Sequence, residues 1–465
     1  MFNVGQKIEV KIEKIITGGD GIGRYGDIVV MVPYSVPGDK LQVSITETKK
    51  NFARAKIVLI ISPSPFRIVP PCPFFYSLHP TPYPLHLRHR RTYSAIPCPY
   101  CGGCNLQMIN YEKQLELKTS IVQDFFDIKV NRIIPAINPF RYRNKVQMPI
   151  GGKTGNVITG FFHPQSHHIV DIKNCLLQTE KANEIILALR NLINEYKIQP
   201  YNEDKRNGVL RHIILRQSYT FNEVMIIFVS KTNFIPYMKE IVERITKKFP
   251  EIISIYQNIN YEKINVILGN KNFKLFGSDR VKEKIGDIIF EIAPSSFFQV
   301  NTQQTLKLYE TIKNFCQFSG NENVIDIYSG VGGISLFLAK HCRKITGIEE
   351  VSSAVSDAIK NAKINNIKNV FFIRGNADYV LKKIDYSKAS DIVIVDPPRI
   401  GCSTIVLNSL LRIQPQKIIY TSCNPATLSR DIKILSQKYK LVEIQPVDMF
   451  PQTAHIECVA RLIKC

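Results

Sequence analysis

The residues Val324–Lys340, VIDIYSGVGGISLFLAK, predict the fold of the C-terminal part of the chain. It starts as a short apolar run, turns through Gly330, Gly332 and Gly333, and continues as an apolar segment of helical character. A strand, a glycine-rich turn and a helix in this order open a doubly wound parallel sheet that binds a nucleotide-like cofactor. From Phe297 onward, predicted strands alternate with predicted helices, so the whole C-terminal part is expected to be α/β.

Three further strand ends identify the cofactor class. Glu349 ends the next predicted strand, about twenty residues on, where a carboxylate can accept hydrogen bonds from ribose hydroxyl groups. That spacing suits NAD or S-adenosylmethionine. Asn376 follows another strand, where an adenine edge would lie, and Asp396–Arg399 (DPPR) ends a fourth strand. A DPPR sequence at this place is typical of methyltransferases and not of dehydrogenases, so the ordered set favours S-adenosylmethionine.

A cysteine and a glutamate follow this set. In KIIYTSCNPATLSRD (Lys417–Asp431), Cys423 ends a strand that Pro425 prevents from continuing. This is the sheet edge at which open α/β folds bind ligands, so we expect a reactive thiol and not core packing. Glu457 lies in a half-apolar strand-like run, where an acid is costly unless it is used or paired. The alternative is that Glu457 lies on an edge strand and that its carboxylate faces water.

Bulk properties limit the class of protein. The chain has 465 residues, enough for two to four domains, and 45% are apolar, which indicates sizeable cores. The net charge of +22 favours a polyanionic partner, with nucleic acid ahead of an anionic membrane. No apolar run approaches the ~20 residues of a membrane-spanning helix, and the first residues lack the core of a signal peptide. We therefore expect no membrane association, a cytoplasmic location and reduced cysteines.

Five of the eleven cysteines have metal-ligand character. Cys98, Cys101 and Cys104 are separated by two residues each, with Cys72 upstream and Cys175 downstream. Repeated Cys-x-x-Cys spacing with glycines lets the backbone wrap around a thiolate-bound centre. Spacing alone allows zinc or an iron–sulfur cluster.

The N-terminal and central parts differ from the α/β part. Residues 2–60 show short alternating strands separated by glycine-rich turns, which predicts a small β-barrel. The stretch 76–97 is rich in proline, histidine and arginine and is expected to be a loop insertion. β-like segments then continue to about residue 290, with one helical block near 180–196. The expected domains are residues 1–61, 62–290 and 291–465.

These motifs, in this order, resemble the RNA uracil-5-methyltransferase family, in particular its large-subunit ribosomal RNA members. The N-terminal barrel resembles a TRAM domain, which binds RNA. The matching motifs further along the chain are YRNKVQ (Tyr142–Gln147), GVLRHIILR (Gly208–Arg216), SSFFQVN (Ser295–Asn301), DIYSGVGG (Asp326–Gly333), DPPRIG (Asp396–Gly401), SCNPATLSRD (Ser422–Asp431) and FPQTAHIE (Phe450–Glu457).

The resemblance implies a [4Fe–4S] site in the central region. The four ligands it implies are Cys72, Cys101, Cys104 and Cys175. The family places its first ligand a few residues before the CGGC sequence, whereas here an insertion follows Cys72 and Cys98 lies closer than the pattern. We favour Cys72 because its context, with an arginine before it and prolines around it, matches, and because a long loop closes at modest entropy.

The resemblance also implies a mechanism and a cofactor site. Cys423 is the implied nucleophile that adds to carbon 6 of uracil, and Glu457 the implied base that removes the proton from carbon 5. A target base inside folded RNA has to be flipped out for this chemistry. The positions that match cofactor contacts are Gln299, Tyr328, Glu349, Asn376 and Asp396.

The expected function is therefore S-adenosylmethionine-dependent methylation of a specific uridine in RNA, with 23S ribosomal RNA as the expected partner and a monomer as the expected state. The alternatives are a tRNA uracil-5-methyltransferase, an RNA cytosine-5-methyltransferase and a non-catalytic RNA-binding factor of ribosome assembly. The TRAM barrel and the cysteine cluster disfavour the cytosine enzyme. The simultaneous presence of Cys423, Glu457 and Asp396 disfavours the non-catalytic factor.

Overall fold

The computed structural model of the chain describes residues 2–76, 100–203, 205–262, 266–383 and 390–465. Most of the expected insertion at 76–97 lies outside these residues, as does Cys98. The chain divides into two compact units. Unit 1 comprises residues 1–121, 159–176 and 450–454, and unit 2 comprises residues 122–158, 177–449 and 455–465. None of the helices in the described residues is long and apolar enough to cross a lipid bilayer.

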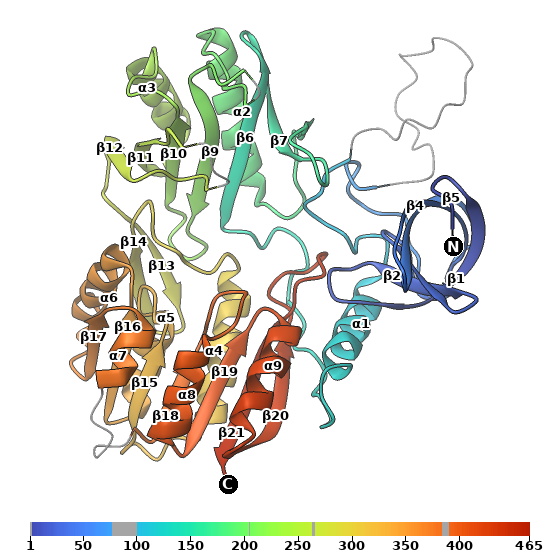
Figure 1. The fold of residues 1–465 in the computed structure, drawn as a ribbon. Coiled ribbons are helices and arrows are strands. Elements are labelled where there is room, and N and C mark those ends of the chain that lie inside the picture. The colour runs from blue at the N-terminus through green and yellow to red at the C-terminus, as the bar shows by residue number, and fades with distance from the viewer. Residues whose placement is uncertain (1, 77–99, 204, 263–265, 384–389) are drawn as a thin grey trace. The chain divides into compact units, whose positions relative to one another are not determined.

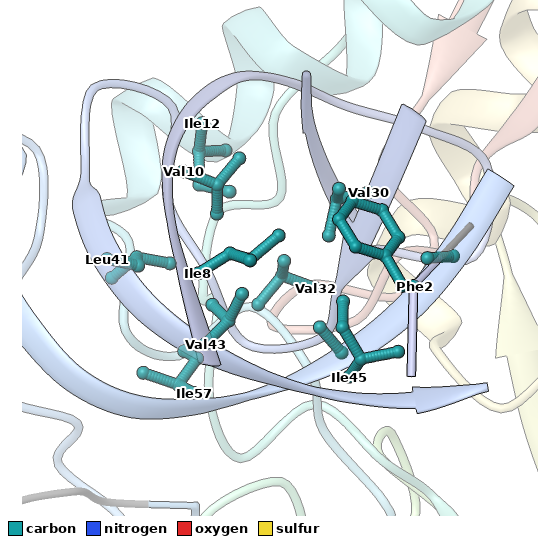
Figure 2. Packing of buried hydrophobic residues seen from close by; sticks show 12 residues of the cluster. Phe2, Ile8, Val10, Ile12, Val30, Val32, Leu41, Val43, Ile45 and Ile57 are labelled. Carbon is teal, nitrogen blue, oxygen red and sulfur yellow. The ribbon is translucent and has the colours of Figure 1, made fainter. Parts of the chain in front are cut away.

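Unit 1 begins with the expected small barrel (Figure 1). Its five strands close in the order β1-β2-β3-β5-β4. They are β1 (Lys7–Ile15), β2 (Gly21–Tyr25), β3 (Ile28–Val32), β4 (Lys40–Thr48) and β5 (Phe52–Ser62). Every second residue of β1 over Lys7–Glu13 is exposed and the residues between are buried, as a strand with one face on a core requires. Figure 2 shows the resulting core, which includes Ile8, Val30 and Val43.

The rest of unit 1 is less regular. Helix α1 (Tyr111–Gln123) follows the cysteine-rich segment, and strand β7 (Asn156–Phe162) carries the chain back into unit 1. There β7 pairs in antiparallel register with β8 (Ile169–Asp171). Cys175 follows β8 closely, so this hairpin returns a fourth cysteine to the unit that holds Cys72, Cys101 and Cys104.

Unit 2 contains a central mixed sheet and a C-terminal sheet. The central strands run in the order β12-β11-β10-β9-β6 (Figure 1). They are β6 (Lys145–Lys153), β9 (Leu210–Gln217), β10 (Val224–Ser230), β11 (Ile252–Ile259) and β12 (Lys271–Gly277). Helix α2 (Glu180–Glu195) matches the expected helical block. Helix α3 (Met238–Lys248) does not, so the expectation of a single helical block in this region was wrong.

The C-terminal sheet is the expected doubly wound sheet. A hairpin of β13 (Val281–Ile285) and β14 (Ile288–Ile292) precedes it. Its strand order is β17-β16-β15-β18-β19-β21-β20, and β17 to β19 are parallel. The strands are β15 (Asn323–Ile327), β16 (Lys344–Glu349), β17 (Val370–Arg374), β18 (Ile392–Val395), β19 (Lys417–Ser422), β20 (Tyr439–Val447) and β21 (Glu457–Lys464). The helices that alternate with them are α4 (Thr302–Cys316), α5 (Gly333–Leu338), α6 (Ser352–Ile364), α7 (Ala377–Lys383), α8 (Thr404–Ile413) and α9 (Pro425–Leu435).

Candidate active site

The sheet brings most of the expected site residues to one edge. Tyr328 follows β15, Glu349 ends β16, Asp396 follows β18 and Cys423 follows β19. Because these strands are parallel, their carboxyl ends meet at the same edge. Glu457 reaches this edge from the opposite direction, because it begins the antiparallel strand β21, in which the next residue pairs with the end of β19.

A tight strand-to-helix turn holds Cys423. The Ser422 hydroxyl oxygen accepts the backbone N–H of Asn424 at 3.1 Å. The Asn424 side chain in turn caps α9 by accepting the N–H of Ala426 at 3.1 Å, and Pro425 occupies the first helical turn. The thiol is half-buried, so it is fixed by its backbone and still open to a reactant.

The electrostatics around Cys423 combine two carboxyl groups and one guanidinium group. Burial and the nearby charge of Glu457 raise the pKa of Cys423 to about 11, whereas the charge of Arg399 lowers it. Burial and the charge of Asp396 hold the pKa of Glu457 well above its usual range, again opposed by Arg399. Burial raises the pKa of Asp396 to about 7. The structure therefore brings the thiol, the expected base and Asp396 into one site.

No role of its own was expected for Arg399 from the sequence, although it belongs to the quoted DPPR motif. In the structure its charge favours the ionised forms of both Cys423 and Glu457. Its position directly after Asp396-Pro-Pro is the sequence signal that could have identified it.

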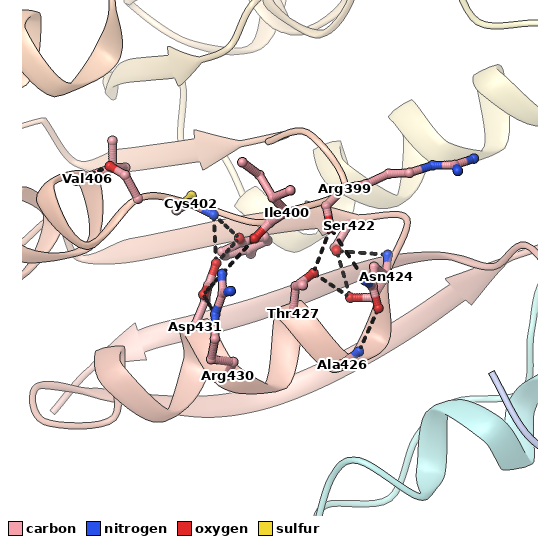
Figure 3. A network of polar contacts seen from close by, with 12 residues as sticks. Arg399, Ile400, Cys402, Val406, Ser422, Asn424, Ala426, Thr427, Arg430 and Asp431 are labelled. Atoms are coloured by element: carbon pink, nitrogen blue, oxygen red, sulfur yellow. Dashed lines mark hydrogen bonds and ion pairs between the residues drawn. The ribbon is translucent and has the colours of Figure 1, made fainter. Parts of the chain in front are cut away.

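A polar network holds the loop that carries Asp396 and Arg399 (Figure 3). The buried carboxylate of Asp431, on α9, accepts hydrogen bonds from the hydroxyl group of Tyr420 at 2.6 Å and from the backbone N–H of Cys402 at 2.8 Å. The neighbouring Arg430 donates to the same carboxylate and to the carbonyl oxygen of Ile400, both at 2.8 Å. These hydrogen bonds therefore connect the loop to helix α9, which begins at Pro425, two residues after Cys423.

Two further contacts hold the Arg399 end of the loop. The carbonyl oxygen of Arg399 accepts hydrogen bonds from the Asn424 side chain at 3.4 Å and from the Thr427 hydroxyl group at 3.5 Å. Gly401 has φ +80°, and a Cβ atom there would lie 2.6 Å from a carboxylate oxygen of Asp431. Only glycine, which has no Cβ atom and readily adopts a positive φ, fits where the loop comes this close to the helix.

The glycine-rich turn is organised by Glu349. Its carboxylate accepts the backbone N–H of Gly330 at 3.0 Å and that of Val351 at 2.8 Å. Asn376 donates to Glu350 at 3.0 Å and accepts the N–H of Asp378 at 2.9 Å. Glu349 and Asn376 therefore lie at the neighbouring ends of β16 and β17, where backbone N–H groups hold the Glu349 carboxylate, and Glu350 and Asp378 hold the Asn376 amide.

Gln299 comes from a different segment, the turn before α4. Its carbonyl oxygen accepts a hydrogen bond from the Asn144 side chain at 3.1 Å, which links this turn to the start of β6. Asn301 then caps α4 by accepting the N–H of Gln304. Tyr328, by contrast, begins the glycine-rich turn itself and has a left-handed backbone with φ +69°.

A sequence model of the tRNA (uracil-5-)-methyltransferase family matches residues 110–465, and a model of the TRAM domain matches residues 2–58. The chain belongs to the tRNA (uracil-5-)-methyltransferase family. It is an S-adenosylmethionine-dependent RNA (uracil-5-)-methyltransferase with an N-terminal TRAM barrel. This assignment sets aside the cytosine-5-methyltransferase and the non-catalytic assembly factor.

Relatives match nearly the full length of the given chain. An uncharacterized RNA methyltransferase of Bacillus cereus is 38% identical over 464 residues, covering 98% of this chain and 96% of the relative. Another from Clostridium tetani is 38% identical over 451 residues, covering 95% and 93%. The crystal structure of Pyrococcus abyssi tRNA (uracil-54, C5)-methyltransferase in complex with S-adenosyl-L-homocysteine is similar with a TM-score of 0.77 and 30% identity, covering 98% of this chain and 99% of that one.

The methyltransferase carries a second set of expected site residues in unit 1. Cys72, Cys101, Cys104 and Cys175 lie near enough that their charges affect one another: burial, Cys175 and Cys72 all raise the pKa of Cys101, to about 12. Within the described residues, however, no group of three or more histidine, cysteine, aspartate or glutamate side chains is arranged so that it could hold a metal ion. The structure thus gathers the four thiols within unit 1.

Proposed function

We propose that this enzyme methylates carbon 5 of a specific uridine through a covalent adduct between Cys423 and the base, resolved by Glu457. The observation that carries the proposal is the shared edge at which the charge of the buried Glu457 raises the pKa of the half-buried thiol, and at which Asp396 and Arg399 act on both groups. S-adenosylmethionine supplies the methyl group as an electrophilic sulfonium. The residues proposed to contact it are Gln299, Tyr328, Glu349, Asn376 and Asp396.

The chemistry explains the need for both groups. Carbon 5 of uracil is a poor nucleophile, and addition of the Cys423 thiolate to carbon 6 turns the ring into an enolate whose carbon 5 can attack the methyl group. The carbon–sulfur bond of the donor breaks, and the methylated ring stays bound to Cys423. Glu457 then takes the proton from carbon 5, the double bond reforms, and the bond between carbon 6 and Cys423 breaks.

The environment of Glu457 supports its role as the base. Burial beside Asp396 holds its pKa well above the usual range of a carboxyl group, so its carboxylate binds a proton more readily than an exposed glutamate does. Arg399 opposes this shift and also favours the Cys423 thiolate, so one guanidinium supports the charged forms of both reacting groups.

Two variants test the mechanism because they are expected to fail differently. Cys423→Ala should bind RNA and donor but form no covalent complex. Glu457→Gln should add Cys423 to the ring and transfer the methyl group, then stall, so that a denaturation-resistant protein–RNA complex accumulates with ordinary uridine. Denaturing gel electrophoresis measures this complex. Normal turnover by Glu457→Gln would make another group the base, with His455 the next candidate, and activity in Cys423→Ala would refute the mechanism.

We propose 23S ribosomal RNA as the substrate. The TRAM barrel and the four gathered thiols support this choice, since the sequence resembles ribosomal RNA members of the family in both features. The similar enzyme of Pyrococcus abyssi acts on uracil 54 of tRNA, so tRNA is the competing substrate. Mapping of 5-methyluridine in ribosomal RNA and tRNA from a deletion strain decides between them, because only the true target loses the modification.

We propose that Cys72, Cys101, Cys104 and Cys175 hold a [4Fe–4S] cluster. A single ion needs all its ligands around one centre, whereas a cubane cluster spreads four cysteine sulfurs over four iron atoms. The four thiols lie close enough together for their charges to affect one another, as the ligands of one cluster must. Methyl transfer needs no electron, so the cluster would have a structural role in unit 1 and not a redox role.

Iron and sulfide content and visible absorption of anaerobically purified protein test the cluster. Cys175→Ser should abolish the absorption, whereas Cys98→Ser should keep it. Loss of the absorption in Cys98→Ser would show that Cys98, and not Cys72, is the fourth ligand.

Finally, we propose three functional parts: an RNA-binding barrel at 1–61, a central part at 62–290 and the methyl-transfer part at 291–465. The TRAM match at 2–58 and the start of the alternating α/β elements with α4 support these limits. The cytoplasmic location and the monomeric state expected from the sequence belong to the same proposal.

A further inference from the structure

Three cations gather where the central sheet begins, and we call Arg143, Lys145 and Arg216 the cation cluster. Lys145, at the start of β6, lies directly opposite Arg216 of β9 in antiparallel register. Arg143 precedes Lys145 by two residues, and burial, together with the charges of Arg216 and Arg143, lowers the pKa of Lys145 to about 7. Like charges placed opposite each other destabilise a sheet, so this arrangement opposes folding.

The cluster also leaves buried donors unused. Arg216 is only 3% exposed, and its guanidinium donates to the carbonyl oxygen of Ser296 at 2.8 Å, but its Nε and Nη1 atoms have no partner in the described residues. The buried Nε atom of Arg143 is likewise without a partner there. In the described part of the chain, the ammonium group of Lys145 has neither a hydrogen bond nor an ion pair. Buried donors without acceptors are costly, which indicates a missing anion.

The acidic side chain whose charge acts on Arg216 does not serve as the missing anion. Glu283 is buried, and its charge raises the pKa of Arg216, opposing the effect of burial. Its carboxylate already accepts the backbone N–H groups of Tyr219 at 2.7 Å and Lys284 at 2.9 Å and the hydroxyl group of Thr302 at 3.0 Å. One occupied carboxylate cannot balance three cations.

The cluster lies beside the segment that leads into the methyl-transfer site. Arg216 donates to Ser296, and Asn144, between the other two cations, donates to the carbonyl oxygen of Gln299. A ligand on the cluster would therefore sit next to the turn that carries Gln299. Arginine and lysine together are the side chains that recognise phosphate oxygens.

We propose that the cation cluster of Arg143, Lys145 and Arg216 binds a backbone phosphate of the substrate RNA close to the target uridine. The proposal rests on the proposed function, because it places the phosphate beside the methyl-transfer site. A carboxylate of S-adenosylmethionine is the other anion in reach. That molecule also carries a sulfonium and an ammonium group, which three cations would repel, whereas a phosphate is a pure anion.

Lys145 is the position for the test, because it is only half-buried and its replacement does not remove a buried guanidinium. Lys145→Gln removes the charge, Lys145→Arg keeps it, and Lys153→Gln removes an exposed charge at the other end of β6. Equilibrium binding of a single-stranded oligouridylate is measured over a range of salt concentrations. We expect Lys145→Gln to bind about ten-fold more weakly and to lower the slope of log K against log salt by about 0.7, the effect of one lost phosphate contact. Lys145→Arg and Lys153→Gln should keep the wild-type slope.

Two further measurements separate the alternatives. Without anions, Lys145→Gln should melt at a higher temperature than the wild type, because repulsion with Arg216 is relieved, and inorganic phosphate should stabilise the wild type more than this variant. S-adenosylhomocysteine should bind all variants equally. An unchanged salt slope in Lys145→Gln, or a loss of S-adenosylhomocysteine binding instead, would overturn the proposal. Failure of the wild type to form any Cys423 adduct would overturn the proposed mechanism but not the phosphate site.

Discussion

The hydroxyl group of Tyr420 donates a 2.6 Å hydrogen bond to the carboxylate of Asp431, and both residues are buried. Tyr420 belongs to β19 and Asp431 to α9, so the bond joins the two elements on either side of the proposed nucleophile. The same carboxylate holds Cys402, at the end of the loop that carries Arg399.

Tyr420→Phe should therefore reduce both stability and turnover. Loss of one hydrogen bond to a buried carboxylate costs about 1–3 kcal/mol, and the loosened loop should slow single-turnover methyl transfer by about ten-fold. Urea unfolding and rapid-quench assays measure the two effects. Tyr439→Phe is the matched control, since the buried Tyr439 donates to the carbonyl oxygen of Pro415 at 3.0 Å, away from the loop. An equal loss of turnover in both variants would show that the Tyr420 bond only stabilises.

The thiol of Cys423 should set the pH dependence of adduct formation. Its pKa of about 11 lies above neutral pH, so the thiolate fraction and the rate of adduct formation with 5-fluorouridine RNA should rise about ten-fold per pH unit between pH 6 and 9. The charged groups that face it are Glu457, Arg399 and Asp396.

Arg399→Gln removes the charge that lowers this pKa, so it should slow adduct formation at every pH below 11. Glu457→Gln removes a charge that raises the pKa and should accelerate it at the alkaline end. Rates that move in the same direction in both variants would contradict this assignment of the charges.

Asp326 should make stability depend on pH. It is fully buried and accepts a 2.6 Å hydrogen bond from Ser335, and burial raises its pKa to about 7. A carboxyl group whose pKa is higher in the folded state favours folding at low pH, and this contribution disappears as the pH rises through 7. Asp326→Asn should therefore gain stability relative to the wild type between pH 4 and 8, by up to about 4 kcal/mol. The melting temperature of both proteins across this range measures it, and a constant difference would contradict the prediction.

The TRAM barrel should contribute RNA contacts through two lysines. Arg54 is paired with Asp20 at 3.1 Å, whereas Lys50 and Lys56 are exposed and have no ion pair in the described residues. Replacing both lysines by glutamine should lower the salt slope of RNA binding by about 1.4 and leave S-adenosylhomocysteine binding unchanged.

The control for this prediction removes the same net charge elsewhere. Lys239→Gln with Lys247→Gln changes two exposed lysines of helix α3. An equal fall of the slope in both double variants would mean that only overall charge matters and that the barrel makes no specific contact.

Much of the methyl-transfer site could be predicted from the sequence, because parallel strands bring the residues that follow them to one edge. Asp396 and Cys423 each stand at such a strand end. The effect of Arg399 on both Cys423 and Glu457, and the bonds of Asp431 to a loop thirty residues earlier, depend on packing between elements that no local pattern records.

Helix α3 shows why local signals can fail. It lies between β10 and β11, two apolar strands rich in isoleucine, and its neighbours suggested continuous β structure. It also begins without a capping side chain: the N-cap residue is Tyr237, which makes no side-chain cap hydrogen bond and has a left-handed backbone with φ 54°. The usual start signal of a helix is therefore absent from the sequence. The pairing of Lys145 with Arg216 was equally hidden, because it depends on the register of two distant strands.

The division of unit 1 among three chain segments has a consequence for the order of events during synthesis. Domains generally form in the order in which the ribosome makes them. Unit 1 starts at the N-terminus, yet it also includes residues 450–454, which follow β20. The nascent barrel can close early from residues of its own, but the unit around it must wait until almost every strand of unit 2 has been translated. The complete unit 1, which includes the four thiols, can therefore form only late in synthesis.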